Sequence, residues 1–179
     1  RNLHKAAKEI VERFSSVVPA DYDTLLTLPG IGPYTAAAIA SIAGNQDVVV
    51  VDANVNRILA RLFDMNEPVK SGPAQKRIAG TAQKLLPKAK ARQFNQALMD
   101  FGGLVCTPRN PSCNLCPVQS ICESYENGTV HKRPVVKQPP KTIFIVRHVA
   151  IIVHKGKVYM QKRKDSSVWG GMWEFPGGE

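Results

Sequence analysis

All four cysteines of the chain lie within residues 106–122, at Cys106, Cys113, Cys116 and Cys122. Their spacing, C-x6-C-x2-C-x5-C, gathers four thiols in one loop, which predicts a single metal centre closed by that loop. Four thiolates this close in sequence can enclose either a cubane iron–sulfur cluster or a zinc ion.

The alternative to a metal is a pair of disulfides, which is typical of small secreted frameworks. The rest of the 179-residue chain is long enough to pack a core without such staples, so the metal is favoured. Most structural zinc sites use two C-x2-C pairs, and only Cys113 and Cys116 form one here. The two outer gaps, of six and five residues, suit a metal cluster, which is larger than a single ion. We therefore predict one 4Fe–4S cluster, with zinc as the alternative.

The residues before the cysteine loop have the apolar periodicity of helices. Apolar residues recur at helical spacing from Leu3 to Phe14, and Pro33 is suited to the first position of another helix. Further helices are predicted at about 55–62, 74–86 and 92–102. The fold class is therefore mainly α, with a partial helical domain over residues 1–126.

The composition changes after Cys122. Residues 127–142 contain Pro134, Pro139 and Pro140 among basic residues, which predicts an extended linker. From residue 143 onward, β-branched residues predict a strand, a turn at 154–157 and a return strand. Residues 143–179 are therefore expected to hold only the first β-strands of a small α+β domain.

The formal net charge of +10 favours a polyanionic partner. Between two predicted helices stands Leu28-Pro29-Gly30-Ile31-Gly32, the pattern of a helix–hairpin–helix. Its glycines allow a sharp turn and let bare N–H groups approach a phosphate, so such a hairpin grips DNA without reading its sequence. Leu28, Gly30, Ile31 and Gly32 are the predicted DNA-binding residues. An ordinary turn between helices is the alternative.

A lone acidic residue, Asp52, follows the short apolar run Val48–Val51 and precedes an amphipathic helix. Asp is a preferred N-cap, so this residue has a purely structural interpretation. A catalytic role becomes the better hypothesis only when the surrounding motifs are taken together. Asn54, two positions later, has the same two interpretations.

The stretch from Leu28 to Arg61, followed by the cysteine loop, resembles the iron–sulfur branch of the helix–hairpin–helix DNA glycosylase superfamily. The resemblance implies that Asp52 stabilises the positive charge that develops on the sugar as the base leaves, and that Asn54 orients its carboxylate. It also implies that Arg109, in the cysteine loop, meets DNA phosphates.

Tyr34 separates two branches of this superfamily. Bifunctional members similar to endonuclease III carry a lysine at this position, whose amine attacks the sugar; tyrosine cannot form that Schiff base. The segment resembles the adenine glycosylases, and this resemblance implies that Tyr34 lies in the adenine pocket. The segment Trp169–Gly178 resembles the approach to a Nudix box, and the adenine glycosylases carry a Nudix-like domain.

The resemblance implies a monomeric, monofunctional enzyme of base-excision repair that hydrolyses the N-glycosidic bond of adenine. Its partner would be double-stranded DNA in which that adenine is mispaired with 8-oxoguanine or guanine. It would be intracellular, in the nucleoid of a bacterium or in the nucleus or mitochondria of a eukaryote.

The family's general acid is a glutamate on a helix that would precede Leu3. We therefore expect the chain to be truncated at both ends and to be inactive alone. Two alternatives remain: a bifunctional glycosylase and AP lyase like endonuclease III, and a non-catalytic DNA-binding iron–sulfur module.

Overall fold

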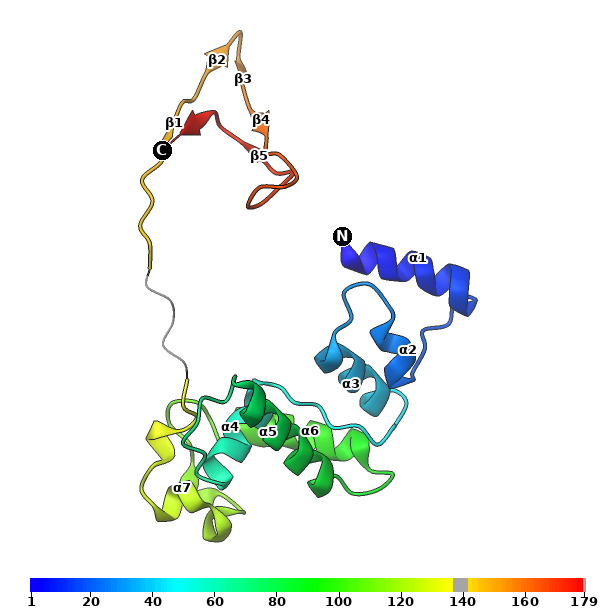
Figure 1. Ribbon diagram of the computed structural model, residues 1–179, viewed down its shortest axis with the longest axis vertical. Helices are drawn as coiled ribbons and strands as arrows, with labels where there is room; N and C mark the ends of the chain where they lie inside the picture. The colour runs from blue at the N-terminus through cyan, green and yellow to red at the C-terminus, as the bar shows by residue number, and fades with distance from the viewer. Residues whose placement is uncertain (137–141, 179) are drawn as a thin grey trace. The chain divides into compact units, whose positions relative to one another are not determined.

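The computed structural model describes residues 1–136 and 142–178. The chain divides into two compact units, Arg1–Lys137 and Gln138–Glu179 (Figure 1). The first unit is built from helices and the second from short strands, as the sequence predicted. No helix within the described residues combines the length and the apolar character needed to cross a lipid bilayer.

The first three helices form one part of the helical unit. They are α1 (Asn2–Phe14), α2 (Tyr22–Leu26) and α3 (Pro33–Ile42). Their apolar faces meet in a small core that includes Ala6, Leu25, Leu28, Ala36 and Ala40. Pro33 occupies the first turn of α3, as predicted, because its missing N–H is one that a helix start leaves unpaired anyway.

The second part of the helical unit contains the longer helices. They are α4 (Ala53–Leu62), α5 (Gly72–Leu85), α6 (Ala91–Leu104) and the short α7 (Glu123–Glu126). The bounds of α4, α5 and α6 lie within about two residues of the prediction, since each helix has one apolar face. Helix α4 contacts α5, α6 and α7, and it is therefore the element on which the unit is assembled.

Residues 127–136 differ from the prediction of an extended linker over 127–142. After α7 the chain makes a single 3-10 turn, η3 (Val130–Lys132), and remains bonded to the end of α4. Asp64 accepts a hydrogen bond from Thr129 at 2.6 Å and pairs with Arg133 at 2.8 Å. The helical unit thus runs to Lys137, and the predicted linker begins later than its composition indicated. Residues 137–141 of that linker lie outside the described residues.

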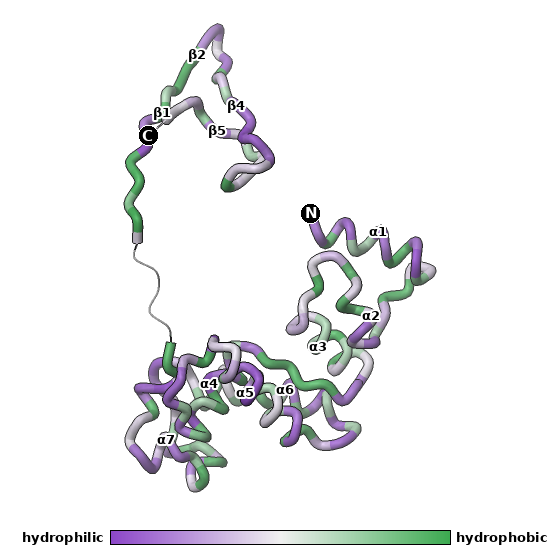
Figure 2. Tube along the Cα trace, in the orientation of Figure 1, coloured by the Kyte–Doolittle hydropathy of each residue, from purple (hydrophilic) through white to green (hydrophobic). Residues whose placement is uncertain are grey.

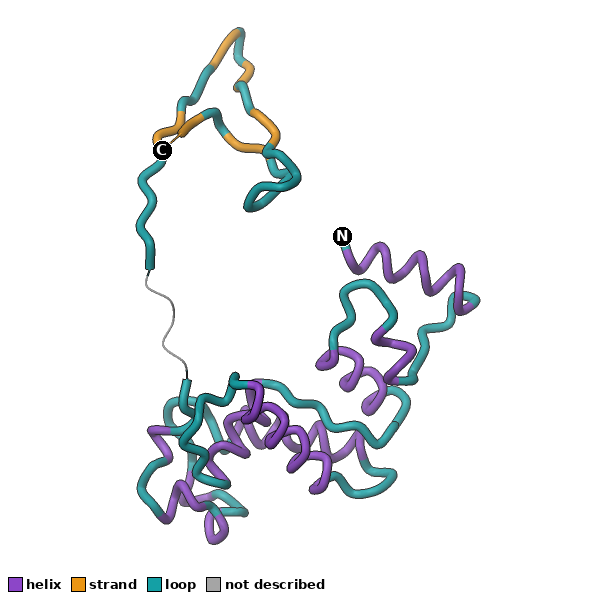
Figure 3. The backbone as a smooth tube through the Cα atoms, in the orientation of Figure 1, coloured by secondary structure: helices purple, strands orange, loops and turns teal. Residues whose placement is uncertain are grey.

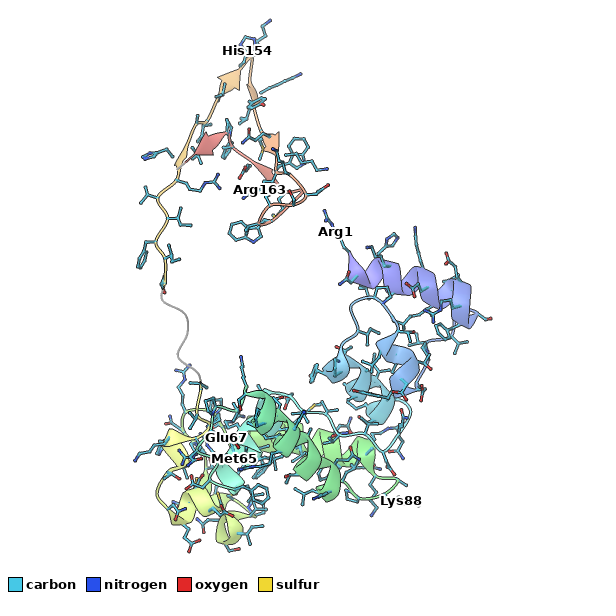
Figure 4. All side chains as sticks on the ribbon, in the orientation of Figure 1. Arg1, Met65, Glu67, Lys88, His154 and Arg163 are labelled. Carbon is cyan, nitrogen blue, oxygen red and sulfur yellow. The ribbon has the colours of Figure 1, made fainter. Side chains whose placement is uncertain are left out.

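The second unit consists of three two-stranded antiparallel ladders (Figure 3). The pairs join β1 (His148–Val149) to β6 (Gly177–Gly178), β2 (Val153–His154) to β3 (Lys157–Val158), and β4 (Gln161–Lys162) to β5 (Trp173–Glu174). The predicted turn at 154–157 is confirmed; Lys155 and Gly156 both have positive φ, as a tight hairpin requires. His154, which is labelled in Figure 4, lies in this hairpin. Arg163, also labelled there, follows β4 and forms an ion pair with Glu174 of β5.

Candidate functional site

The four cysteines line one cavity against α4 and α6. Two 3-10 turns, η1 (Cys113–Leu115) and η2 (Gln119–Ile121), carry the loop around the cavity. The other lining residues are mostly apolar: Ile58, Leu62, Phe101, Val105, Val118 and Val130 among them. All four thiols are free, so the disulfide alternative is not realised. The sequence prediction that Cys106, Cys113, Cys116 and Cys122 come together is thus met by the geometry.

The thiols are close enough to influence one another. Burial raises the pKa of Cys113, and the charges of the other three cysteines raise it further. No three His, Cys, Asp or Glu side chains in the described part of the chain are placed to hold a single metal ion. Four thiols around a mainly apolar cavity are the donor set of an iron–sulfur cluster, and the residues present fit that group.

Two buried arginines of α4 bind the backbone of this loop. Arg57 donates from Nε to the carbonyl of Cys106 at 2.8 Å and from Nη2 to the carbonyl of Gly102 at 2.7 Å. Arg61 donates to the carbonyls of Thr107 and Pro108 and lies 3.4 Å from the sulfur of Cys106. Burial is the main cause that lowers the pKa of Arg57. These charges therefore hold the start of the cysteine loop against α4.

Asp52 is the N-cap of α4. Its Oδ1 accepts from the backbone N–H of Val55 at 2.7 Å, and its Oδ2 accepts from the side-chain amide of Asn54 at 2.9 Å. Its capping role is thus observed, and the carboxylate keeps further lone pairs for another positive group. Asn54 in turn accepts from Arg57 Nη2 at 2.7 Å. The predicted role of Asn54 in orienting Asp52 is compatible with this geometry.

Hydrogen bonds from Asn54 to Asp52, from Arg57 to Asn54 and from Arg57 to Cys106 link the N-terminus of α4 to the cysteine loop. Gly102 makes this link possible. A Cβ at Gly102 would lie 2.6 Å from the Cβ of Asn54, which is closer than atoms approach without displacement. Helix α6 therefore needs a glycine where it passes Asn54.

The hairpin residues lie between α2 and α3. Leu28 is 2% exposed and packs in the core, so a DNA contact of this residue would come from its backbone. Gly30 has φ +80°, a conformation that glycine adopts without strain, and it is exposed. Gly32 has φ −95° and is the N-cap of α3, while Ile31 is half-buried. The turn thus presents the start of α3 at the surface, as an anion-binding hairpin requires.

Tyr34 is 51% exposed and lines a groove between α3 and α5. Val48, Val49 and Val51 line the same groove, so Tyr34 faces the segment that leads into Asp52. Arg109 lies exposed in the cysteine loop. The structure therefore brings Tyr34 near the Asp52 segment and keeps Arg109 and the hairpin at the surface.

Arg57, Arg61 and Gly102 were not predicted from the sequence. A signal was present for the arginines, because Asn54, Arg57 and Arg61 follow one another at spacings of three and four and share one side of the helix. A polar stripe of this kind on a helix is ordinarily expected to face the solvent. No local pattern marks Gly102, whose neighbour in space comes from a different helix.

Three family models match parts of the chain. A helix–hairpin–helix motif matches residues 13–42, the iron–sulfur binding domain of endonuclease III matches residues 106–122, and a NUDIX domain matches residues 148–179. The second match confirms the predicted 4Fe–4S cluster, and the matched residues are those of the loop that contains the four cysteines. The third confirms that the strands resemble the start of a Nudix-like domain.

The chain is similar to curated adenine DNA glycosylases. One from Buchnera aphidicola subsp. Baizongia pistaciae is 32% identical over 98% of this chain and 50% of its own length. The human protein is 42% identical over 69% of this chain and 23% of its own length. The chain therefore spans half or less of the length of these relatives.

Solved structures of DNA glycosylases have a similar fold. A thermostable thymine-DNA glycosylase has a TM-score of 0.63 at 33% identity, over 70% of this chain and 58% of its own. A trapped covalent intermediate of endonuclease III with DNA has a TM-score of 0.60 at 27% identity, over 72% of this chain and 59% of its own.

Proposed function

Because the chain belongs to the helix–hairpin–helix DNA glycosylases that carry an iron–sulfur loop, we propose that the native protein containing it removes adenine from DNA. The reaction is hydrolysis of the N-glycosidic bond of an adenine paired with 8-oxoguanine or guanine, a step of base-excision repair. The adenine is turned out of the duplex so that its sugar can reach the enzyme's acidic residue.

The observation that carries this proposal is the placement of Asp52. Its two hydrogen bonds, from Val55 and Asn54, fix the carboxylate at the N-terminus of α4. As the bond to the base lengthens, positive charge develops on the sugar ring, and a carboxylate held in place stabilises it without having to reorganise. Water then adds to the sugar, and an abasic site remains.

Tyr34 supports the monofunctional form of this reaction. It stands at the start of α3, in the groove that the Asp52 segment also lines. A phenol does not form a Schiff base with the sugar, so cleavage of the strand has no nucleophile at this position. Its exposed ring is available to contact the extruded adenine.

The rest of the helical unit holds the DNA. The hairpin at 28–32 offers backbone N–H groups to phosphates, and Arg109 offers a charge from the cysteine loop; both act on any sequence. The thiolates of Cys106, Cys113, Cys116 and Cys122 would hold the cluster, and its binding would tie residues 106–122 together. The native protein is proposed to act as a monomer within the cell, where its DNA is found.

The test is a single-turnover assay of the native protein on a duplex that contains one adenine opposite 8-oxoguanine. We expect abasic sites that are revealed by alkali and no strand cleavage without alkali. Strand cleavage without alkali would instead indicate a bifunctional glycosylase. Binding of the duplex with neither product would indicate a DNA-binding module, and either result would overturn the proposal.

A further inference from the structure

The segment that leads into Asp52 is extended and partly buried, although it belongs to no sheet. Val48 to Val51 connect α3 to α4 as an apolar stretch of loop (Figures 2 and 3). Val50 has no exposed surface and Val49 is 8% exposed. In an extended chain, successive residues direct their N–H and C=O groups to opposite edges. Each edge therefore needs hydrogen-bond partners, since a buried backbone group without one is costly.

A single amide side chain from α6 satisfies the buried edge. The Oδ1 of Asn95 accepts from the N–H of Val50 at 2.9 Å, and its Nδ2 donates to the carbonyl of Val48 at 2.9 Å. The amide of Asn95 thus pairs with this segment as a neighbouring strand would. Asn95 is itself 1% exposed, and its bond to Val50 is buried.

A second amide, from α5, pairs with the opposite edge. Gln83 Oε1 accepts from the N–H of Val49 at 3.2 Å, and Nε2 donates to the carbonyl of Asp47 at 2.9 Å. The two edges differ in one respect: the side chain of Gln83 is exposed. Water can take over the bonds of Gln83, whereas it cannot take over the buried bond between Asn95 and Val50.

Only Val51 separates this pairing from Asp52, so a shift of Val50 moves the carboxylate. We propose that Asn95 is a positioning residue for Asp52: its amide fixes the backbone of Val48 and Val50 and so sets where the carboxylate stands against the sugar. This inference rests on the proposed function, which assigns Asp52 a catalytic role. Helix α6 then holds Asp52 from two directions, through Asn95 before it and through the Gly102 carbonyl, Arg57 and Asn54 after it.

The test compares Asn95→Leu and Asn95→Asp with the wild-type native protein in single-turnover release of adenine. Asn95→Leu removes both bonds, and Asn95→Asp keeps the acceptor for Val50 but loses the donor to Val48. Misplacing a catalytic group by about 1 Å costs roughly a hundredfold in rate. We expect the rate constant to fall about a hundredfold in Asn95→Leu and about tenfold in Asn95→Asp, at unchanged affinity for the duplex.

The amplitude of the single turnover separates positioning from folding. A role confined to folding lowers the fraction of active molecules and leaves the rate constant of the remaining molecules unchanged. Gln96→Leu is the matched control, since Gln96 is the next residue of α6 and is exposed. Gln83→Leu should change the rate constant by less than about threefold, because water replaces its bonds. An Asn95→Asp rate constant within about threefold of wild type would overturn the proposal.

A second measurement does not depend on the reaction. The amide of Val55 is protected from hydrogen exchange by its bond to Asp52, so its exchange reports the position of the carboxylate. We expect its exchange in this chain to accelerate in Asn95→Asp and to be unchanged in Gln96→Leu. Unchanged exchange in Asn95→Asp would overturn the proposal even if the protein released no adenine. If wild type released none while exchange responded as expected, only the proposed function would fail.

Discussion

Two aspartates stand at the two ends of α4, and they are used differently. Asp52 at the N-terminus accepts two hydrogen bonds, from Val55 and Asn54. Asp64, just beyond the C-terminus, accepts from Ser124, Asn127 and Thr129 and pairs with Arg133. An ionised carboxylate has about four lone-pair sites. The carboxylate of Asp64 meets four groups of the chain itself, whereas that of Asp52 accepts two hydrogen bonds and keeps lone pairs for a positive charge from outside.

The comparison teaches that the neighbours of an acidic residue, more than its place at a helix end, decide its use. Asp64 fastens residues 124–133 to the end of α4, the helix whose arginines bind the cysteine loop. Asp52 is held by fewer partners and directly follows Val51, which lines the same groove as Tyr34. We therefore expect substitutions of Asp64 to change stability and substitutions of Asp52 to change activity.

The strongest test of this division is Asp52→Asn in the native protein. The single-turnover rate of adenine release should fall about a hundred- to a thousandfold, because a preorganised charge facing the cationic sugar is lost. Affinity for the duplex and thermal stability should change little, since Asn is about as good an N-cap as Asp. Asp64→Asn is the control and should release adenine within about threefold of wild type. A rate within a few-fold of wild type in Asp52→Asn would reduce Asp52 to a helix cap.

The second test concerns Asp64 and acid. Hydrogen bonds from Thr129 and Asn127, and then the charge of Arg133, hold the pKa of Asp64 below its ordinary value. A lowered folded-state pKa contributes stability that is complete above the unfolded value, near 4, and is lost as the pH falls through the folded value. Asp64→Asn should therefore melt at a lower temperature than wild type at pH 7, and the difference should shrink as the pH falls below about 4.

Calorimetry of the cluster-loaded chain between pH 7 and pH 3 measures this difference. Asp100→Asn serves as the control, because Asp100 is exposed on α6. A melting difference that stayed constant over this pH range would show that Asp64 holds residues 124–133 by shape alone. It would also remove the contrast with Asp52.

The sequence predicted the helices and the gathering of the four cysteines, and it offered a helix cap as the structural alternative at Asp52, because each depends on residues close together in the chain. Periodicity placed α1 and α3 to α6, and the spacing of the cysteines predicted their cavity. The bonds of Asp64 join residues about 60 positions apart, so the composition near residue 127 does not reveal them. The prolines there therefore led to the prediction of a linker from 127. The buried arginines were missed for the same reason, since the carbonyls that accept from Arg61 belong to a loop distant in sequence.

The smallest expected effect compares two adjacent glycines of α6. A Cβ at Gly103 would meet open space, so Gly103→Ala should stabilise the helix by about 0.5–1 kcal/mol and leave the rate unchanged. Gly102→Ala makes the same gain in helix propensity but places a methyl group 2.6 Å from the Cβ of Asn54. Asn54 must then move, and the bond that it donates to Asp52 is weakened.

We expect Gly102→Ala to lower the rate of adenine release about tenfold, a fraction of the effect of Asp52→Asn, because the charge remains and only its placement is disturbed. Parallel single-turnover assays and melting curves of the two alanine variants give the comparison directly. Equal rates in both variants would mean that Asp52 holds its position without Asn54. In that case the carboxylate would depend on its bond to Val55 and on the segment before it, and the link through Arg57 to the cysteine loop would serve the loop alone.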